Sequence, residues 1–205
     1  MTPGAPYRWR DEAAIRDFVA QAGFGLLCVA APERLHVVHL PLVWLDDRRI
    51  GLHIHCANPI VRHLDGQDAL IVVTGPHAYI SPDWYGLPDK VPTWNYQSAE
   101  LRGAMTRLDH DATVAQIDAL TIEQEQRLSP KPLWTRDKMT PGHFDRLMAG
   151  LVGFAMQVDS MDGTAKLGQD KPEQARIGLA QALENDGAAD LAALMRATVG
   201  QEDAA

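Results

Sequence analysis

The chain has 205 residues, and its 19 Lys and Arg against 27 Asp and Glu give a formal net charge of −8. A domain that binds nucleic acid through its phosphates usually has a net positive charge, so this balance disfavours direct contact with DNA. With 46% hydrophobic and 22% charged residues, the chain can form a packed core and is not disordered.

Apolar spacing in the first third of the chain predicts a helix followed by a meander of strands. The helix is expected over 11–22 and ends at Gly23. Pro41 favours an edge or a bulge in the second strand, and Asn58-Pro59 opens a short helix. Turn sequences separate the strands expected here, which are 24–31, 35–45 and 50–56.

The rest of the chain predicts further strands and then helices. Residues 69–74 form a strand that Gly75-Pro76 interrupts, and 81–93 form a proline-rich loop. Two more strands are expected at 94–107 and 151–158, and helices at 111–128, 140–149, 172–183 and 188–199. Roughly six strands with tight early connections predict a mainly antiparallel barrel with flanking helices, an α+β fold. We expect this barrel domain over 1–185 and a C-terminal helical tail over 186–205.

The expected lack of a secretory or membrane-spanning stretch and the two cysteines favour a cytoplasmic protein. The first residues have no apolar stretch of the secretory type. No run approaches the roughly 18 apolar residues of a membrane-spanning helix. Cys28 and Cys56 both lie in apolar or histidine-bearing runs and are expected to be reduced thiols.

The strand 50–56 carries a pair of histidines. His53 and His55 are two residues apart and therefore point to one face of a strand. Such a pair could bind zinc with a third ligand such as His39. The alternative is a polar face beside a ligand or an interface, and we favour it because no carboxylate or cysteine completes a metal-binding pattern.

Two segments rich in proline and aromatic residues are typical of a site for a flat ring. They are 74–85 and 91–96, and in both, indole or phenol faces stand beside polar groups. The alternative is that Trp84, Tyr85 and Trp94 only close one end of the barrel. Lys166, in a loop expected over 162–171, could be a partner for a phosphate or an ordinary solvated lysine. The chain has no P-loop, dinucleotide-binding glycine motif or nucleophile elbow.

Several of these segments together resemble one family, the PaiB-type FMN-binding negative transcriptional regulators. The similarity runs from about Tyr7 to Leu183 and rests on six motifs in order. They are His39-Leu40-Pro41-Leu42, Ala57-Asn58-Pro59, Gly75-Pro76-His77-Ala78-Tyr79-Ile80-Ser81-Pro82-x-Trp84-Tyr85, Val91-Pro92-Thr93-Trp94-Asn95-Tyr96, Leu151-Val152-Gly153-Phe154 and Lys166-Leu167-x-Gln169.

The resemblance implies a split β-barrel of the FMN-binding, pyridoxamine-phosphate-oxidase-like kind. It further implies a homodimer with FMN held between the subunits, and a role in bacterial transcriptional regulation. Thr93 and Asn95 would donate or accept hydrogen bonds, and Trp94 would form an apolar wall. The cofactor-binding residues that the resemblance indicates are His39, Leu40, Pro41, His53, His55, Ala57, Asn58, Thr93, Trp94, Asn95, Tyr96, Lys166 and Gln169.

The chain departs from the family pattern in two places. In the run 164–171 it keeps the family's Lys and Gln, as Lys166 and Gln169, but not its Trp, Ser, Asn and Arg. The other place is position 56. Cys56 stands where the family has an arginine, the residue best suited to bind a phosphate with two hydrogen bonds. Lys166, Arg102 and Arg62 are the candidates for a compensating charge. A flavoprotein that senses or carries flavin is the expected function, and the alternative is a flavin-dependent oxidoreductase acting on a small molecule, because the fold alone does not define an activity.

Overall fold

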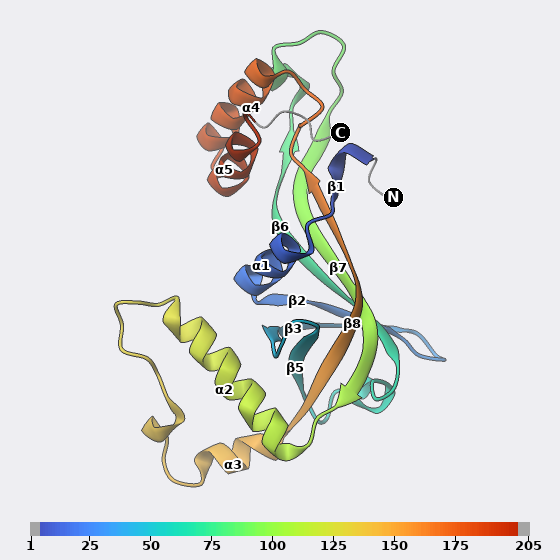
Figure 1. Cartoon of the computed structure of the whole chain (residues 1–205), viewed down its shortest axis with the longest axis vertical. Coiled ribbons are helices and arrows are strands. Elements are labelled where there is room, and N and C mark those ends of the chain that lie inside the picture. Colours follow the sequence, from blue (N-terminus) through green and yellow to red (C-terminus); the bar gives the residue numbers. More distant parts are fainter. Residues whose placement is uncertain (1–4, 201–205) are drawn as a thin grey trace. The chain divides into compact units, whose positions relative to one another are not determined.

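The structure is a computed structural model, and it describes residues 5–200. The chain divides into two compact units, each built from separate stretches of sequence. The first unit consists of the described part of residues 1–11, 74–99 and 162–205, and the second of residues 12–73 and 100–161. Figure 1 labels the α-helices and most of the strands.

Eight strands form one sheet in the order β3-β2-β6-β7-β8-β5-β4, and β1 pairs with β8. The pairs β2–β3, β2–β6, β4–β5 and β5–β8 are antiparallel. The strands are β1 (Arg8–Trp9), β2 (Phe24–Ala30), β3 (Leu35–Pro41), β4 (Val43–Trp44), β5 (Arg49–His55), β6 (Asp68–Ile80), β7 (Thr93–Arg107) and β8 (Leu151–Lys166). The last three strands contribute residues to both units.

Helices connect and cover these strands. The α-helices are α1 (Glu12–Ala22), α2 (His110–Gln126), α3 (His143–Met148), α4 (Glu173–Asn185) and α5 (Ala189–Ala197). The 3-10 helices are η1 (Ala5–Tyr7), η2 (Pro59–His63), η3 (Pro82–Tyr85) and η4 (Arg136–Lys138). Asp109 caps α2 by accepting a hydrogen bond from Ala112 N, and Asn58 caps η2 in the same way from Ile60 N.

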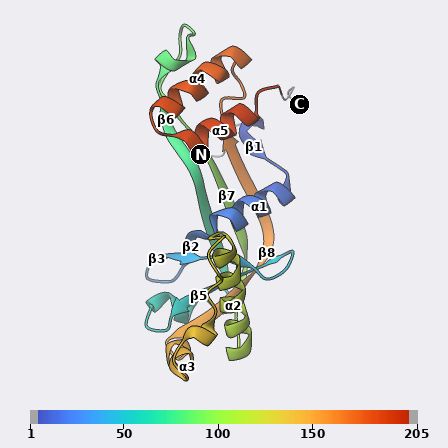
Figure 2. The same cartoon turned by 90° about the vertical axis from the view of Figure 1, so that its left-hand side faces the viewer.

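The second unit has its core between α1, α2 and the strand faces that alternate inward. Helix α1 buries Ile15 and Val19, which are four residues apart and therefore lie on one side of the helix. Helix α2 covers part of β5 and β8, as Figures 1 and 2 show. The fully buried strand residues of this unit include Leu27, Leu40, Ile50, Leu52, Ile71, Leu101 and Phe154.

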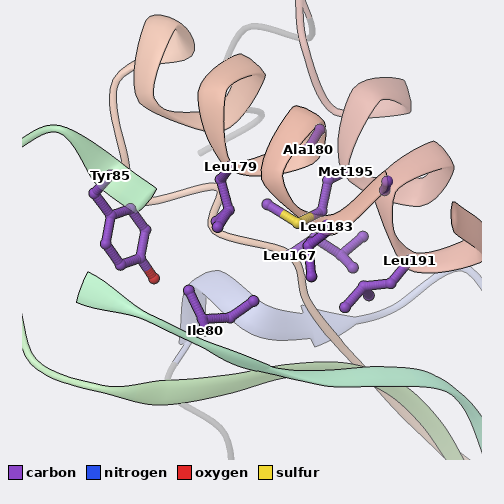
Figure 3. Close-up of a cluster of buried hydrophobic side chains, with 9 residues drawn as sticks. Ile80, Tyr85, Leu167, Leu179, Ala180, Leu183, Leu191 and Met195 are labelled. Carbon is purple, nitrogen blue, oxygen red and sulfur yellow. The ribbon is translucent and has the colours of Figure 1, made fainter. Parts of the chain in front are cut away.

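The first unit has a separate hydrophobic cluster beneath α4 and α5. These two helices lie side by side, and Ala188 N donates a hydrogen bond to Leu183 O in the turn between them. Figure 3 shows their apolar side chains directed toward Ile80 at the end of β6 and toward Tyr85. The buried members are Ile80, Tyr85, Leu167, Leu179, Ala180, Leu183, Leu191, Ala192 and Met195.

Strands β7 and β8 approach so closely at one position that only glycine fits. A Cβ added to Gly103 would lie 1.7 Å from the carbonyl oxygen of Gln157. Real Cβ atoms essentially never come within 3.0 Å of another heavy atom, so any side chain here would force two backbones apart.

The predicted mainly antiparallel sheet with flanking helices is confirmed, but three strand boundaries are corrected. Strand β6 continues through Gly75-Pro76 to Ile80. Pairing with β2 covers Leu70–Val72, so Pro76 lies beyond it, where a missing N–H costs the sheet little. Strand β8 extends to Lys166, so the loop expected from 162 begins later. The strand expected over 35–45 is split into β3 and β4 after Pro41.

Candidate functional site

An apolar face of the second unit is open to solvent on β2, β3 and β6. Along β2 and β3, alternate residues point inward to the core, and the others point outward. Phe24 is 52% exposed, Leu35 63% and Val37 50%. The outward residues, called the apolar face below, are Phe24, Leu26, Cys28, Ala30, Leu35, Val37, His39, Pro41, Leu70 and Val72.

This face differs from the usual solvated side of an antiparallel sheet. Such a sheet normally alternates apolar residues toward the core with polar residues toward water. Here the outward positions are apolar as well, and they adjoin across the strands, since Leu26 pairs with His39 and Val72, and Cys28 with Val37 and Leu70. A contiguous exposed apolar surface of this kind marks an interaction or ligand-binding site.

The structure places His39 and Pro41, two predicted site residues, on the apolar face. The His39 imidazole stacks on Phe24, with ring centroids 6.4 Å apart and planes inclined by 29°. Leu40, the residue between them, points the other way and is buried in the core. The β3 motif therefore supplies two outward side chains and one core side chain.

The histidine pair of β5 lies on a different surface. Its strand neighbours on the same face are Gly51 and, across the β5–β8 pair, Gly153. A Cβ at these two glycines would meet Gln116 and Thr113 of α2, so that helix covers this face. His53 is half-buried there, and burial lowers its pKa. Its Nδ1 atom and the amide of Gln116 are buried without a hydrogen-bond partner among the described residues.

The residues that follow β5 shape the chain locally. The His55 Nδ1 atom accepts a hydrogen bond from Ala57 N at 3.2 Å. Asn58 Oδ1 accepts from Ile60 N at 3.1 Å and so begins η2. His55, Cys56 and Ala57 are exposed, whereas Asn58 is half-buried. Two of these predicted site residues, His55 and Asn58, thus have a structural hydrogen bond that the motif alone did not reveal.

In the first unit, the motif 91–96 divides between two faces of β7. Asn95 is 1% exposed and its Nδ2 donates to the Met195 sulfur at 3.6 Å, so it belongs to the interior beneath α5. Trp94 points outward and is 54% exposed. It contacts His77 at 6.1 Å and Tyr79 at 6.3 Å between ring centroids. Tyr96 shares the outward side of the strand with Trp94.

Lys166 joins a polar network in the first unit. Its ammonium donates to the hydroxyl of Thr93, so these two predicted site residues are brought together. The ammonium also lies 5.9 Å from the centre of the Tyr7 ring. Burial raises the pKa of Tyr7 to about 12, and the charge and hydrogen bond of Asp170 act in the same direction. Asp170 in turn pairs with Lys171.

Gln169 has both ends of its amide occupied by neighbouring backbone. Its Oε1 accepts from Leu167 N at 2.8 Å, and its Nε2 donates to Ala165 O. Gly168 beside it has φ +78°, a left-handed conformation that favours glycine. The Gln169 side chain therefore closes the turn that leads from β8 toward α4.

A cavity of about 320 Å³ lies elsewhere in the first unit. It is lined by Gly75, Pro76 and His77 of β6 and by residues 187–191 at the start of α5. None of the thirteen predicted site residues lines it. Asp190 places a negative charge at its edge, which disfavours a phosphate there.

Sequence reasoning missed one group of side chains in the second unit. The rings of His36 and His63 are 5.3 Å apart, and the charges of Arg34 and Arg62 act on His36. Only Arg62 was expected to contribute charge near a ligand. Arg34, His36 and His63 belong to no recognised motif. The sequence signal for them would have been basic residues on each of two segments that the fold brings together.

The structure also bears on metals and membranes. Among residues 5–200, no group of three or more His, Cys, Asp or Glu side chains gathers as a metal site. No helix within the same range is long and apolar enough to cross a membrane. Cys28 and Cys56 are both free thiols, and burial raises the pKa of Cys28.

Comparisons with known proteins agree with the predicted family and fold. Residues 1–160 match the family described as "Putative FMN-binding domain". The chain is 30% identical over 176 residues to the Bacillus subtilis protein named "Protease synthase and sporulation protein PAI 2", and the match covers 84% of each chain.

Two solved structures resemble the chain at low sequence identity. One is the FAD and heme binding protein from Mycobacterium smegmatis, with a TM-score of 0.58, 16% identity and coverage of 79% of this chain and 74% of that chain. The other is the flavocytochrome Anf3 from Azotobacter vinelandii, with a TM-score of 0.58, 14% identity and coverage of 81% and 77%. These likenesses confirm the split β-barrel fold.

Proposed function

Because this chain belongs to the FMN-binding domain family of the PaiB type, we propose that it binds FMN between two copies of itself, on the apolar face of β2, β3 and β6. One observation carries this proposal: nine of ten adjoining outward positions of the second unit are apolar, and the tenth is His39. A second copy that covers this face would remove it from water, which is the main favourable contribution to association.

The side chains of the face fit a flavin. FMN joins a flat, largely apolar ring system to a phosphate, and when bound it supplies a redox-active ring. The stacked Phe24 and His39 rings offer a flat aromatic surface, and the imidazole adds a group that can hydrogen-bond at one edge. Phe24 and His39 would orient the ring, and the second copy would exclude water from it.

The remaining predicted contacts form a separate proposal. Among them, Lys166 is the best candidate for an FMN contact, because it places a positive charge beside the Thr93 hydroxyl in the first unit. Asn95 and Gln169 support the fold of that unit through their own hydrogen bonds. If a Lys166→Met variant bound FMN as tightly as the parent chain, Lys166 would not be part of the FMN site.

Net charge and cysteine chemistry support two further parts of the proposal. A formal charge of −8 disfavours direct contact with DNA, so any regulatory action is proposed to pass through the ligand or a partner. The free thiols of Cys28 and Cys56 support a reducing, cytoplasmic location. An electrophoretic shift that persists at high salt with competitor DNA would contradict the first of these.

The decisive experiment measures FMN binding and solution mass on the same samples. The variant is Val37→Asp, which puts a charge in the middle of the apolar face. The matched control is Leu147→Asp, since Leu147 is 51% exposed on α3 and lies off that face. We expect the parent chain and the control to be dimers that bind FMN, and Val37→Asp to be a folded monomer with FMN affinity lowered about tenfold or more. A dimeric Val37→Asp that retains FMN would refute the proposed site.

A further inference from the structure

Four basic side chains come together at one end of the second unit. They are Arg34 and His36 at the start of β3, and Arg62 and His63 at the end of η2. The rings of His36 and His63 have centroids 5.3 Å apart and planes inclined by 30°. His36 is 9% exposed, so one of the four is almost removed from water.

Local structure holds these residues in place. Ala31 and Arg34 exchange two backbone hydrogen bonds, of 3.0 and 3.2 Å, which close the turn between β2 and β3. On the other segment, Asn58 caps η2 and Pro59 begins it, so Arg62 and His63 fall in its last turn. The Arg62 Nε atom donates to Pro59 O at 3.3 Å. That bond holds the guanidinium against its own helix and leaves its terminal nitrogens for another acceptor.

The arginines of this cluster differ from most others in the chain. Arg16, Arg48, Arg49, Arg127 and Arg196 each pair with a carboxylate. Across residues 5–200, Arg34 and Arg62 have no such ion pair. In a chain with a formal charge of −8, this is a local excess of positive charge.

Neighbouring charges act on His36. Burial lowers the pKa of His36, and the charges of Arg34, His63 and Arg62 lower it further. Glu33 acts in the opposite direction. Like charges this close destabilise one another, and a bound anion would offset that cost. Two histidine rings could also bind a metal cation, but two guanidinium groups beside them would repel it.

We propose that Arg34, His36, Arg62 and His63 form a binding site for the phosphate group of a phosphomonoester. A guanidinium presents paired N–H donors that match phosphate oxygens, and a protonated imidazole adds a further charged donor. FMN carries such a group, and naming FMN as its source rests on the proposed function, in a pose that reaches around β3, because His36 and His39 point to opposite sides of that strand. The phosphate site itself does not depend on that function.

The first experiment titrates the full chain with inorganic phosphate and follows the His36 and His63 ring signals by NMR. The variant is Arg34→Gln/Arg62→Gln, and the control is Arg48→Gln/Arg49→Gln, which removes the same charge from another part of the second unit. Phosphate should raise the pKa of both histidines in the parent chain and the control. The affinity for phosphate should fall about tenfold or more in the variant, as the loss of charge-assisted hydrogen bonds predicts.

Circular dichroism checks that the double variant folds. If the double variant is unfolded, the milder single change His63→Gln takes its place in the test. A smaller loss of phosphate affinity is expected for His63→Gln. The proposal would be overturned if the folded double variant bound phosphate as tightly as the parent chain. If the double variant is unfolded, the same result in His63→Gln would overturn it. So would a parent chain whose histidine signals do not change when phosphate is added.

A second arm compares FMN with riboflavin, which lacks the phosphate. If the phosphate of FMN occupies the cluster, the double variant loses FMN affinity and keeps its riboflavin affinity. If FMN and riboflavin bind the double variant as they bind the parent chain while inorganic phosphate does not, the cluster serves another phosphomonoester and the assignment to FMN is overturned. A parent chain that binds phosphate at the cluster but no flavin would refute the proposed function and leave the phosphate site standing.

Discussion

The two units differ in which motif residues face outward. In the first unit, Asn95 lies under α5 and Gln169 closes a turn, whereas Trp94 of the same motif points outward. In the second unit, the β3 motif turns His39 outward onto an exposed apolar face. The comparison teaches that residues of one family signature can divide between building the fold and facing a ligand.

The largest expected effect is a loss of stability on adding a side chain where β7 and β8 lie closest together. Gly103→Ala places a Cβ against the Gln157 carbonyl, so the second unit should lose about 3 kcal/mol or more of unfolding free energy. The control is Gly86→Ala in the first unit, where φ is +61° and no atom lies within 4 Å of the added Cβ. Its cost should be about 1 kcal/mol, from backbone strain alone. Equal losses in urea unfolding would show that the close approach of β7 and β8 does not matter.

Alkaline pH should destabilise the first unit through Tyr7. The ordinary pKa of 10.0 is raised to about 12 by burial first and by Asp170 second. The folded chain therefore keeps the phenol proton where the unfolded chain has lost it. The stability contributed is fully present below pH 10 and is lost as the pH rises toward about 12. Tyr7→Phe should flatten this dependence, by up to about 2 kcal/mol, and a spectrophotometric titration with all tyrosines ionising near pH 10 would contradict it.

The comparison between the two units is sharpest for one pair of variants. Asn95→Ala should lower the unfolding free energy by about 1 kcal/mol, because a buried amide loses its packing and its contact with Met195. FMN affinity should remain. His39→Ala should do the reverse, with unchanged thermal stability and weaker FMN binding, because its ring is exposed. If the two variants showed the same pattern in calorimetry and in flavin titration, the division of roles would be wrong.

The smallest effect is expected in mild acid and belongs to the second unit. Burial lowers the pKa of both His36 and His53. The unfolded chain, with the ordinary value of 6.5, binds protons first. The contribution of both groups is present above pH 6.5 and declines as the pH falls below it. The thermal midpoint should be lower at pH 5 than at pH 7, and the difference should be smaller in His53→Gln. Sulfate bound by Arg34, His36, Arg62 and His63 should also reduce the difference. A midpoint that does not depend on pH would show that neither histidine contributes to this effect.

Much of the fold follows from local sequence. The helix over 12–22 ended by Gly23 and the capped helix at Asn58-Pro59 both form as expected, because each depends on neighbouring residues. Strand ends were less predictable. Gly75-Pro76 reads as a break, yet β6 continues to Ile80. Its pairing with β2 ends at Val72, so the missing N–H of Pro76 removes no hydrogen bond to that strand.

The motifs correctly indicated the family. The cofactor-binding role of the thirteen residues stays a prediction, and the structure adds a contact between two of them, Lys166 and Thr93. The motifs did not indicate which face of a strand each residue occupies in the folded chain, and Leu40 and Asn95 proved to be interior. The division of domains at residue 185 stays a prediction.

The sequence by itself determined the fold class and the family, because periodic apolar residues and contiguous motifs encode information over short distances. Its charge of −8 also set direct DNA binding aside as an expectation. Only the tertiary structure brought Arg34 and His36 next to Arg62 and His63, and only it exposed the outward side of β2 and β3 as a continuous surface. Both features depend on which segments pair in space, and that is a non-local property that no run of neighbouring residues contains.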